Sequence, residues 1–397
     1  MNALPMKASH VTVSIVHCSL FIGMSALAQP PVHFRMQRVS LETYESVGAF
    51  DVNGDQKPDL VSGAFWYEGP AFIKKHPIGE VKRVGEYYDD FSTLPVDANG
   101  DGKLDFVTGG WWSGSLHWRE NPLAFGQLPA NNHSAPPEWP DHVLGICGNV
   151  ETTRAWDVDG DGHPEFVPNN PGFPLKYFRL NRDATGKPLG TFSEHKIYDG
   201  KQGHGLGFGD VNSDGRNDFV LPDGWLEAPV HPLTDAWAWH PDFSLGITSV
   251  PIIVTDVNGD GRTDLIAGQG HSYGLDWYEQ RPDRTWKKHA IDPNHSQFHE
   301  MQWVDLDGDN KPELLTGKRY RAHNDNDPGS HDDYGLYYYQ WTGENFVKQV
   351  ICYGAVGQTK GTGIHLAVTD LNADGKPDIA VAGKDGLSVF FNEGVQP

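Results

Sequence analysis

The sequence predicts an all-β fold, a seven-bladed β-propeller of four-stranded blades whose ring is closed by the N-terminal strand. An acidic phrase of nine residues carries this prediction. It reads Asp-Val-Asn-Gly-Asp-Gln-Lys-Pro-Asp at 51–59 and returns from Asp97, Asp157, Asp210, Asp256, Asp305 and Asp370. The shortest step between copies is 46 residues (51 to 97) and the longest is 65 (305 to 370). An apolar run typical of a β-strand follows each copy, and this spacing is typical of propellers and other repeat arrays.

Each repeat contains the pattern of four strands. A short segment rich in small residues precedes the phrase, as at 46–50 and 205–209, and suits the crowded innermost strand around a channel. An apolar strand follows the phrase, and then comes a third strand with aromatic residues, as at 275–278. A fourth strand alternates basic and aliphatic residues, as at 286–291. Four strands per repeat make one propeller blade.

The two ends of the chain complete one blade between them. The last repeat shows three strands and ends at 386–391, whereas 34–40 has the fourth-strand pattern but precedes the first phrase. Pairing these two segments would close the ring and remove exposed strand edges. The longer insertions, at 122–140 and 321–333, are rich in Pro, Asn, Asp or His and are predicted to be loops.

The first 28 residues resemble a secretory signal peptide. Lys7 is followed by an apolar stretch from 11 to 24 and by the small-residue site Ala26-Leu27-Ala28. We therefore expect a secreted or periplasmic protein whose mature part, 29–397, is a single monomeric propeller domain without a membrane span. Cys147 and Cys352 belong to distant repeats, so free thiols are favoured over a disulfide between them.

The acidic phrase has the oxygen spacing of a calcium-binding loop. Oxygen-bearing side chains occupy positions 1, 3, 5 and 9 of every copy, and Ca²⁺ prefers several oxygens on a tight turn. The ligands predicted for up to seven calcium ions are Asp51, Asn53, Asp55, Asp59, Asp97, Asn99, Asp101, Asp105, Asp157, Asp159, Asp161, Glu165, Asp210, Asn212, Asp214, Asp218, Asp256, Asn258, Asp260, Asp264, Asp305, Asp307, Asp309, Glu313, Asp370, Asn372, Asp374 and Asp378.

Two copies depart from the usual glycine at position 6, and a metal-free interpretation also exists. Gln56 and Asn310 occupy this position, where the backbone is left-handed, and Gln tolerates that conformation less well than Asn. We therefore expect the first calcium site to be the least favourable. The alternative, that the acids form Asx turns without metal, is disfavoured because carboxylates this close repel one another.

The net charge of -22 follows largely from these loops. Their ligand positions hold 23 of the 53 acidic residues, so the acidity is mainly a property of the predicted metal sites. Nothing in the chain resembles the basic surface that nucleic acid requires. Nucleic acid is therefore excluded as a partner.

Function is expected at the opposite end of the inner strands. The residue six places before each phrase should lie at the channel rim farthest from the loops. These residues are Glu45, Phe91, Glu151, His204, Val250, His299 and Ile364, and Asp90 and His365 stand beside two of the apolar ones. A carboxylate or imidazole thus falls near one rim in six blades. One such residue alone would be an ordinary channel residue, but their convergence indicates a functional pocket.

Imidazole and carboxylate groups at this rim suggest a second kind of metal site. We hypothesise that Glu151, His204, His271 and His299 bind a transition metal such as zinc and are catalytic. The ion would assist proton abstraction beside a sugar carbonyl or carboxylate, with a His or Tyr as base. Aromatic and charged neighbours suit sugar rings. The predicted substrate-binding residues are Glu45, Asp90, Arg154, Trp66, Trp112, Lys318, Arg319, Arg321, His365 and Lys384.

The loops and their following strands resemble the FG-GAP and VCBS repeats of integrin α-type seven-bladed propellers and of many secreted bacterial proteins. The resemblance covers nearly the whole mature chain and implies the propeller fold. The segments Gly203-His-Gly-Leu-Gly-Phe-Gly-Asp210 and Asp223-Gly-Trp-Leu-Glu-Ala-Pro229 also look like the propeller domain of fungal aldos-2-ulose dehydratases. That resemblance implies metal-assisted dehydration of a keto sugar, although the cupin domains of those enzymes have no counterpart here.

Two classes of function remain open. The first is a carbon-oxygen lyase that acts on keto sugars or uronate glycans at the rim. The second is a non-catalytic module that binds carbohydrate or a cell-surface ligand with the same face. The approach of His204, His299 and Glu151 to metal-ligand distance would favour the first class. Gly270-His-Ser-Tyr-Gly274 matches a hydrolase motif, but a strand pattern follows it where that motif needs a helix, so a serine hydrolase is disfavoured.

Overall fold

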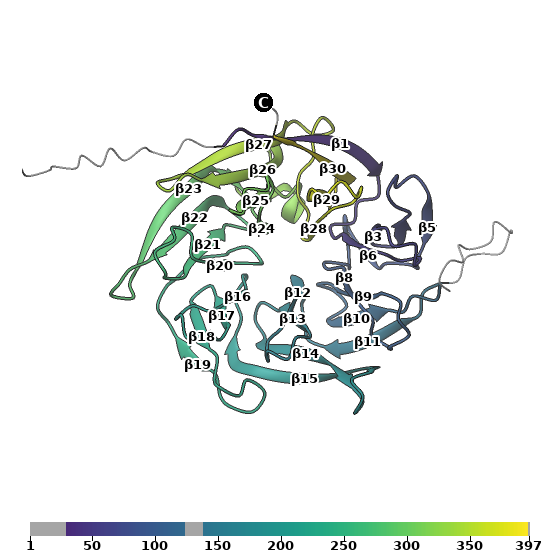
Figure 1. Cartoon of the computed structure of the whole chain (residues 1–397), viewed down its shortest axis with the longest axis horizontal. Helices are drawn as coiled ribbons and strands as arrows, with labels where there is room; N and C mark the ends of the chain where they lie inside the picture. Colours follow the sequence, from purple (N-terminus) through teal and green to yellow (C-terminus); the bar gives the residue numbers. More distant parts are fainter. Residues whose placement is uncertain (1–28, 124–137, 396–397) are drawn as a thin grey trace, which may run out of the picture.

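The computed structural model describes residues 29–123 and 138–395, and seven four-stranded antiparallel sheets surround a central axis (Figure 1). The predicted all-β fold and its seven blades are confirmed. The predicted signal segment and most of the 122–140 insertion lie outside the described residues. A two-stranded hairpin, β6 (Arg83–Val84) and β7 (Tyr87–Tyr88), and one 3₁₀ turn, η1 (Ala322–Asp325), are additional elements. Within the described residues, nothing helical has the length needed to cross a bilayer.

The first three blades follow one another along the chain. Blade 1 contains β2 (Gly48–Phe50), β3 (Asp59–Ser62), β4 (Phe65–Tyr67) and β5 (Lys75–Pro77). Blade 2 contains β8 (Leu94–Val96), β9 (Asp105–Gly109), β10 (Ser115–Arg119) and β11 (Asp141–Ile146). Blade 3 contains β12 (Thr152–Trp156), β13 (Glu165–Asn169), β14 (Pro174–Arg182) and β15 (Pro188–Lys201).

The next three blades repeat the same order, and the seventh combines both ends of the chain. Blade 4 contains β16 (Gly207–Gly209), β17 (Asp218–Leu221), β18 (Gly224–Glu227) and β19 (Ala238–His240). Blade 5 contains β20 (Ile253–Thr255), β21 (Asp264–Gly268), β22 (Tyr273–Gln280) and β23 (Trp286–Ser296). Blade 6 contains β24 (Met301–Val304), β25 (Glu313–Gly317), β26 (Tyr334–Trp341) and β27 (Phe346–Gly354). Blade 7 contains β28 (Leu366–Thr369), β29 (Asp378–Gly383), β30 (Gly386–Val395) and β1 (Val32–Ser40).

The strand that precedes each acidic phrase is the innermost strand of its blade, as the ring in Figure 1 shows. Crowding there explains the small residues. A Cβ added at Gly48 would lie 2.8 Å from the carbonyl oxygen of Thr93 in the neighbouring blade, closer than such atoms can approach. Because adjacent strands are antiparallel, the acidic phrases lie at one end of the blades, called here the loop end. The starts of the inner strands lie at the other, the rim end.

Strand β1 closes the ring, as predicted. It pairs antiparallel with β30, so that Met36 lies opposite Phe390. Its first residue also bonds to blade 6, because the Val32 backbone N–H donates to the Tyr338 hydroxyl at 2.7 Å. The strand edge that β30 would otherwise expose is therefore covered.

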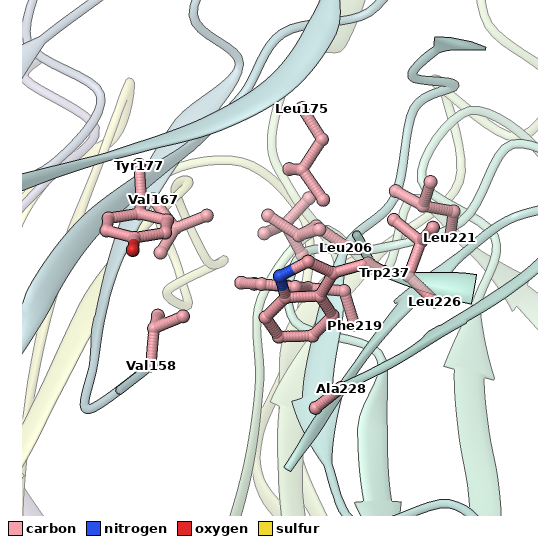
Figure 2. Packing of buried hydrophobic residues seen from close by; sticks show 11 residues of the cluster. Val158, Val167, Leu175, Tyr177, Leu206, Phe219, Leu221, Leu226, Ala228 and Trp237 are labelled. Carbon is pink, nitrogen blue, oxygen red and sulfur yellow. The ribbon is translucent and has the colours of Figure 1, made fainter. Parts of the chain in front are cut away.

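The hydrophobic cores lie between neighbouring blades. Figure 2 shows one of them, in which Val167 and Leu175 of blade 3 pack with Phe219 and Leu226 of blade 4. Trp237, in the connection between β18 and β19, covers the same cluster. Each blade thus buries its faces against two neighbours, which makes the ring a single packed unit.

The acidic phrases fold as tight loops that their own backbone holds together. In the second copy, Asp97 accepts hydrogen bonds from the N–H groups of Gly100 (2.7 Å) and Gly102 (3.0 Å). Position 6 is left-handed even without glycine, with φ of 67° at Gln56 and 65° at Asn310. Gln56 therefore adopts the backbone that the loop requires, despite its less suitable side chain.

Cys147 and Cys352 are free, and no disulfide joins them. The turn at 270–274 leads into strand β22, so the helix that a hydrolase nucleophile motif needs is not formed there.

Candidate functional site

Four predicted residues from four segments converge at the rim end. Glu151, His204 and His299 stand just before the inner strands β12, β16 and β24, whereas His271 lies in the turn between β21 and β22. His204 Nε2 is 3.2 Å from Glu151 Oε1 and 3.0 Å from His271 Nε2. His299 Nε2 is 3.8 Å from Glu151 Oε1. One ligand atom from each of the four lies within 4.8 Å of all the others, and we call them the rim cluster.

The hydrogen bonds of His204 and His271 determine which ring nitrogen carries a proton. His204 Nδ1 is 2.6 Å from the carbonyl oxygen of Thr248, and His271 Nδ1 is 2.9 Å from a carboxylate oxygen of Asp327. Both partners can only accept, so each Nδ1 is protonated, and in the neutral form of each ring Nε2 presents a lone pair. The two lone pairs face one another beside a carboxylate. The two lone pairs and the negative carboxylate repel one another unless a cation, either a proton or a metal ion, lies between them.

The spacing of these atoms is close to that around a metal ion. Zinc lies about 2.0–2.2 Å from nitrogen and carboxylate oxygen, so neighbouring ligand atoms of a tetrahedral site are separated by about 3.3–3.6 Å. The separations of 3.0 and 3.2 Å around His204 Nε2 lie just below this range, and the 3.8 Å from His299 Nε2 to Glu151 lies just above it, so small shifts would be needed to surround an ion. Glu151, His204 and His299 thus approach one another, with His271 as the fourth member, and their role as metal ligands stays a prediction.

Burial and neighbouring charges set the protonation of the rim cluster. Burial favours a neutral Glu151, but His204 and Arg319 outweigh it and lower the pKa of Glu151 to about 2. Burial, followed by the nearby His204, lowers the pKa of His271 to about 4. Burial and then Arg319 hold the pKa of His299 well below its usual range. Burial opposes a charge on His204, but the charge of Glu151 and its hydrogen bond outweigh burial and raise the pKa of His204. The cluster therefore combines a carboxylate and two neutral imidazoles with His204, whose Nε2 holds a proton that a metal ion would have to displace.

A cavity of about 410 Å³ opens above the rim cluster. Its floor contains Glu151, His204, His271 and Arg319, and the other lining residues are Tyr87, Phe91, Trp111, Trp112, Pro171, His323 and Asn324. The Trp112 ring centroid lies 5.3 Å from that of Tyr87 and 5.9 Å from that of Phe91, so these rings form one aromatic wall. We call this cavity the rim pocket. Its volume and its mixture of aromatic wall and polar floor are those of a small-molecule site.

Several predicted substrate-binding residues form an ion-pair network beside the pocket. Arg319 donates to Glu45 at 2.8 Å and to His299 at 3.0 Å, which fixes the guanidinium under the pocket. Lys384 Nζ lies 3.7 Å from the Glu45 carboxylate. Arg321 reaches Glu86 at 3.1 Å. Of the ten predicted substrate-binding residues, Trp112 and Arg319 line the rim pocket directly.

Four other predicted substrate-binding residues do not line the rim pocket. Trp66 is buried in blade 1 and stacks on His76, Lys318 is buried and donates to Gln297, and His365 is bonded to the carbonyl of Val47. Asp90 is buried at a separate cavity of about 260 Å³ between blades 1 and 2.

Arg154 connects blades across the central axis. Its guanidinium bonds to Glu300 of blade 6 and to the carbonyl of Val250 ahead of blade 5, although Arg154 itself belongs to blade 3. Both side chains of the Arg154–Glu300 pair are buried. Arg154 is therefore held in the channel and does not line the rim pocket.

The sequence did not single out every residue of the pocket. Tyr87 comes from the β6–β7 hairpin, which interrupts the four-strand repeat, and Asn324 comes from the 321–333 insertion. Asp327, which bonds to His271 but does not line the pocket, comes from the same insertion. Counting from the acidic phrases cannot locate residues in insertions. The His, Asn and Asp content of 321–333 was the available signal.

Comparisons with known proteins agree with this architecture. A model of the FG-GAP-like repeat matches residues 148–221 and 256–316, whereas no curated protein matches the chain. Crystal structures of BBS1N in complex with ARL6DN, soaked with mercury or lead, have TM-scores of 0.52 and 0.51 at 12% and 11% identity. They cover 91% and 92% of this chain, and 98% of the matched chain in each case.

A further similar structure is that of an Agrocybe aegerita lectin that recognises non-reducing terminal N-acetylglucosamine. Its TM-score is 0.47 at 16% identity, over 78% of this chain and 80% of that one. At such identities, structural likeness bears on the fold alone. Family match and blade arrangement together identify the protein as a seven-bladed β-propeller that contains FG-GAP-like repeats.

Proposed function

We propose that the rim cluster binds a transition metal ion such as zinc, and that the rim pocket above it binds a carbohydrate. The observation that carries this proposal is the 3.0 Å approach of His204 Nε2 to His271 Nε2, with both Nδ1 atoms committed to acceptors. Imidazole nitrogen with one carboxylate is a donor set that suits zinc and similar ions. The acidic loops at the opposite end offer only oxygen, so the two ends would select different metals.

The composition of the pocket supports a sugar as its ligand. The C–H faces of a sugar ring stack on aromatic side chains, which Tyr87 and Trp112 offer on one wall. Hydroxyl and carbonyl groups of the same ring need charged or polar partners, which Glu151 and Arg319 offer on the floor. A sugar stacked against these aromatic side chains would stand on its edge above the polar floor, with one end directed at the rim cluster.

The reaction that this arrangement suits is the elimination of a β-oxygen from a keto sugar or a uronate glycan. A bound ion would polarise the carbonyl or carboxylate oxygen and acidify the adjacent C–H. One of His323 and Tyr87, pocket residues outside the rim cluster, would take the proton from this C–H, and the other would donate a proton to the β-oxygen as its bond to carbon breaks. His323 is oriented for this role, because its Nδ1 lies 3.0 Å from a carboxylate oxygen of Asp327.

We also propose that the acidic loops bind calcium and stabilise the ring. In the third loop, ligand atoms of Asp157, Asp159 and Glu165 lie within 4.8 Å of one another, and Asp305, Asp307 and Glu313 do the same in the sixth. A set of carboxylate oxygens at this spacing fits a hard cation. The proposed secreted or periplasmic location, where calcium is plentiful, depends on the signal-like segment at 1–28.

The aromatic wall also favours a second function, carbohydrate recognition without chemistry. Tyr87, Phe91 and Trp112 would bind a glycan in the same way whether or not a bond is broken afterwards. In that case the ion would only orient the ligand.

Metal analysis combined with sugar assays tests both functions. After calcium is removed by mild chelation, wild-type protein should retain about one equivalent of zinc or a similar ion per chain. His204→Ala should lose the ion and any turnover of keto sugars or uronate glycans. His240→Ala is the matched control, because His240 lies in the same blade on the outer strand β19 and pairs with Glu227.

The outcomes separate the candidates. Retained metal with β-elimination activity supports the lyase, and retained metal with sugar binding but no reaction supports recognition. Protein that holds calcium alone and binds no sugar would overturn the proposed function.

A further inference from the structure

His271 differs from the rest of the rim cluster in how it is held. Glu151, His204 and His299 stand at the starts of inner strands, but His271 lies in a turn between two strands. Two side chains of the segment 320–333, called here the strap, support its ring. Asp327 lies 2.9 Å from His271 Nδ1, and the His323 ring stacks on the His271 ring at 4.2 Å with an interplanar angle of 4°.

One carboxylate therefore organises two imidazoles. Asp327 accepts from His271 Nδ1 through one oxygen and from His323 Nδ1, at 3.0 Å, through the other. The first bond keeps the proton on Nδ1 of His271 and directs its Nε2 lone pair at His204 and Glu151. A carboxylate behind a ligating imidazole also makes the ring a better donor to a metal ion.

The strap has an unusual backbone that brings Asp327 to this position. Four residues with side chains, Arg321, His323, Asn324 and Asp325, have left-handed φ values between 48° and 62°. This conformation is unfavourable for residues other than glycine. Bonds to the rest of the protein maintain it, among them Lys384 Nζ to the Arg321 carbonyl at 2.6 Å and Tyr273 to Asp332 at 2.6 Å.

We propose that Asp327 is a positioning residue that sets the affinity of the rim cluster for its metal ion. By the same linkage, the bound ion holds the strap against the rim pocket, since coupling between two sites is reciprocal. This inference rests on the proposed function, because it requires that the rim cluster bind a metal. Asp327 acts through His271 and does not contact the ion.

A pair of aspartates in the same strap provides a controlled test. Zinc affinity is measured by competition with a chromophoric chelator, with calcium in excess to occupy the acidic loops. Asp327→Asn should weaken zinc binding by about 10–100-fold. Asp332→Asn, which removes a carboxylate that holds the strap through Tyr273, should change it by less than about twofold.

A second measurement reads the coupling in the other direction. In wild-type protein, zinc should slow hydrogen exchange in 320–333, and in Asp327→Asn this protection should be largely lost. Thermal unfolding of both variants establishes that they remain folded.

The possible failures are distinguishable. If the wild-type rim binds no zinc, the proposed function itself fails. If wild type binds zinc and Asp327→Asn binds it equally well, this inference alone is wrong. A second zinc equivalent that disappears in Asp327→Asn would show Asp327 to be a ligand, together with His271 and His323, and would also overturn the positioning role.

Discussion

A buried carboxylate in this protein is held by several donors at once, and Asp292 on β23 is an example. It accepts from the Tyr339 hydroxyl at 2.6 Å, from His295 Nδ1 at 2.9 Å and from Lys348 at 3.1 Å. Burial favours its neutral form, but these donors outweigh burial and hold the pKa of Asp292 well below its usual range. The ionised carboxylate therefore stabilises the pairing of β23 with blade 6.

Replacing Asp292 with Asn should reveal this contribution through its pH dependence. Because the folded-state pKa is depressed, the stabilisation is present above the unfolded pKa of about 3.9 and is lost as pH falls toward the folded pKa. We expect Asp292→Asn to lower the free energy of unfolding by about 1–3 kcal/mol at pH 7, and the difference to shrink below about pH 4. Urea denaturation at several pH values measures both quantities.

The exposed Asp199 supplies the control. Asp199→Asn removes a carboxylate whose side chain is 84% exposed, so it should change stability little at any pH. A difference between Asp292→Asn and wild type that is constant from pH 7 to pH 3 would contradict the role assigned to the ionised group.

Single residues also show what sequence alone can locate. Glu151, His204 and His299 were predictable because a fixed offset from the acidic phrase corresponds to a fixed height on an inner strand. Arg154 was predicted in the same region, yet its long side chain reaches across the axis to Glu300. Asp327 was missed because its position depends on the left-handed backbone of the strap, which no repeat pattern encodes.

At the scale of elements, strand β1 closes the ring although it comes first in the sequence. It is the fourth strand of blade 7, although the rest of that blade comes from the other end of the chain. This pairing was predictable because the last repeat shows only three strand patterns, whereas segment 34–40 has a fourth-strand pattern but precedes the first acidic phrase. The β6–β7 hairpin was not predicted, since its strands have two residues each and no alternating pattern to detect.

Deleting residues 29–40 should destabilise the ring and promote aggregation. The deletion uncovers the edge of β30, most of whose residues are buried, and leaves its N–H and C=O groups unpaired. We expect a loss of roughly 3–5 kcal/mol in the free energy of unfolding, seen as a lower thermal midpoint with increased light scattering.

Adding the missing strand as a separate peptide provides a control. A synthetic peptide of residues 29–40 should restore the thermal midpoint by pairing with β30. A truncated protein as stable as the full chain would show that ring closure is not needed for stability.

For the whole molecule, charge is distributed between two unlike ends. The loop end concentrates 23 carboxylates in seven repeated loops, whereas the rim end balances Glu45 and Glu86 against Arg319, Arg321 and Lys384. The seven-fold repetition made the overall fold predictable, because each copy supported the same interpretation. The pocket was less predictable, because it arises where the repeats differ from one another.

Calcium should raise the stability of the whole ring. Binding to the folded state contributes about 2.7 kcal/mol per site when free calcium is 100 times the dissociation constant. We therefore expect the thermal midpoint to rise steadily with calcium concentration and to fall on chelation, with magnesium much less effective. A thermal midpoint that does not change with calcium concentration would show that the loops are held by their backbone hydrogen bonds alone.

The Arg154–Glu300 ion pair has a consequence for the movement of ligands along the central axis of the ring. Blades 3 and 6 are not neighbours, so a bond between their inner strands must cross the axis and narrow the passage beneath the rim cluster. A polymer that threaded from one face of the ring to the other would have to break this buried ion pair. We therefore expect ligands to enter and leave the rim pocket from the rim end.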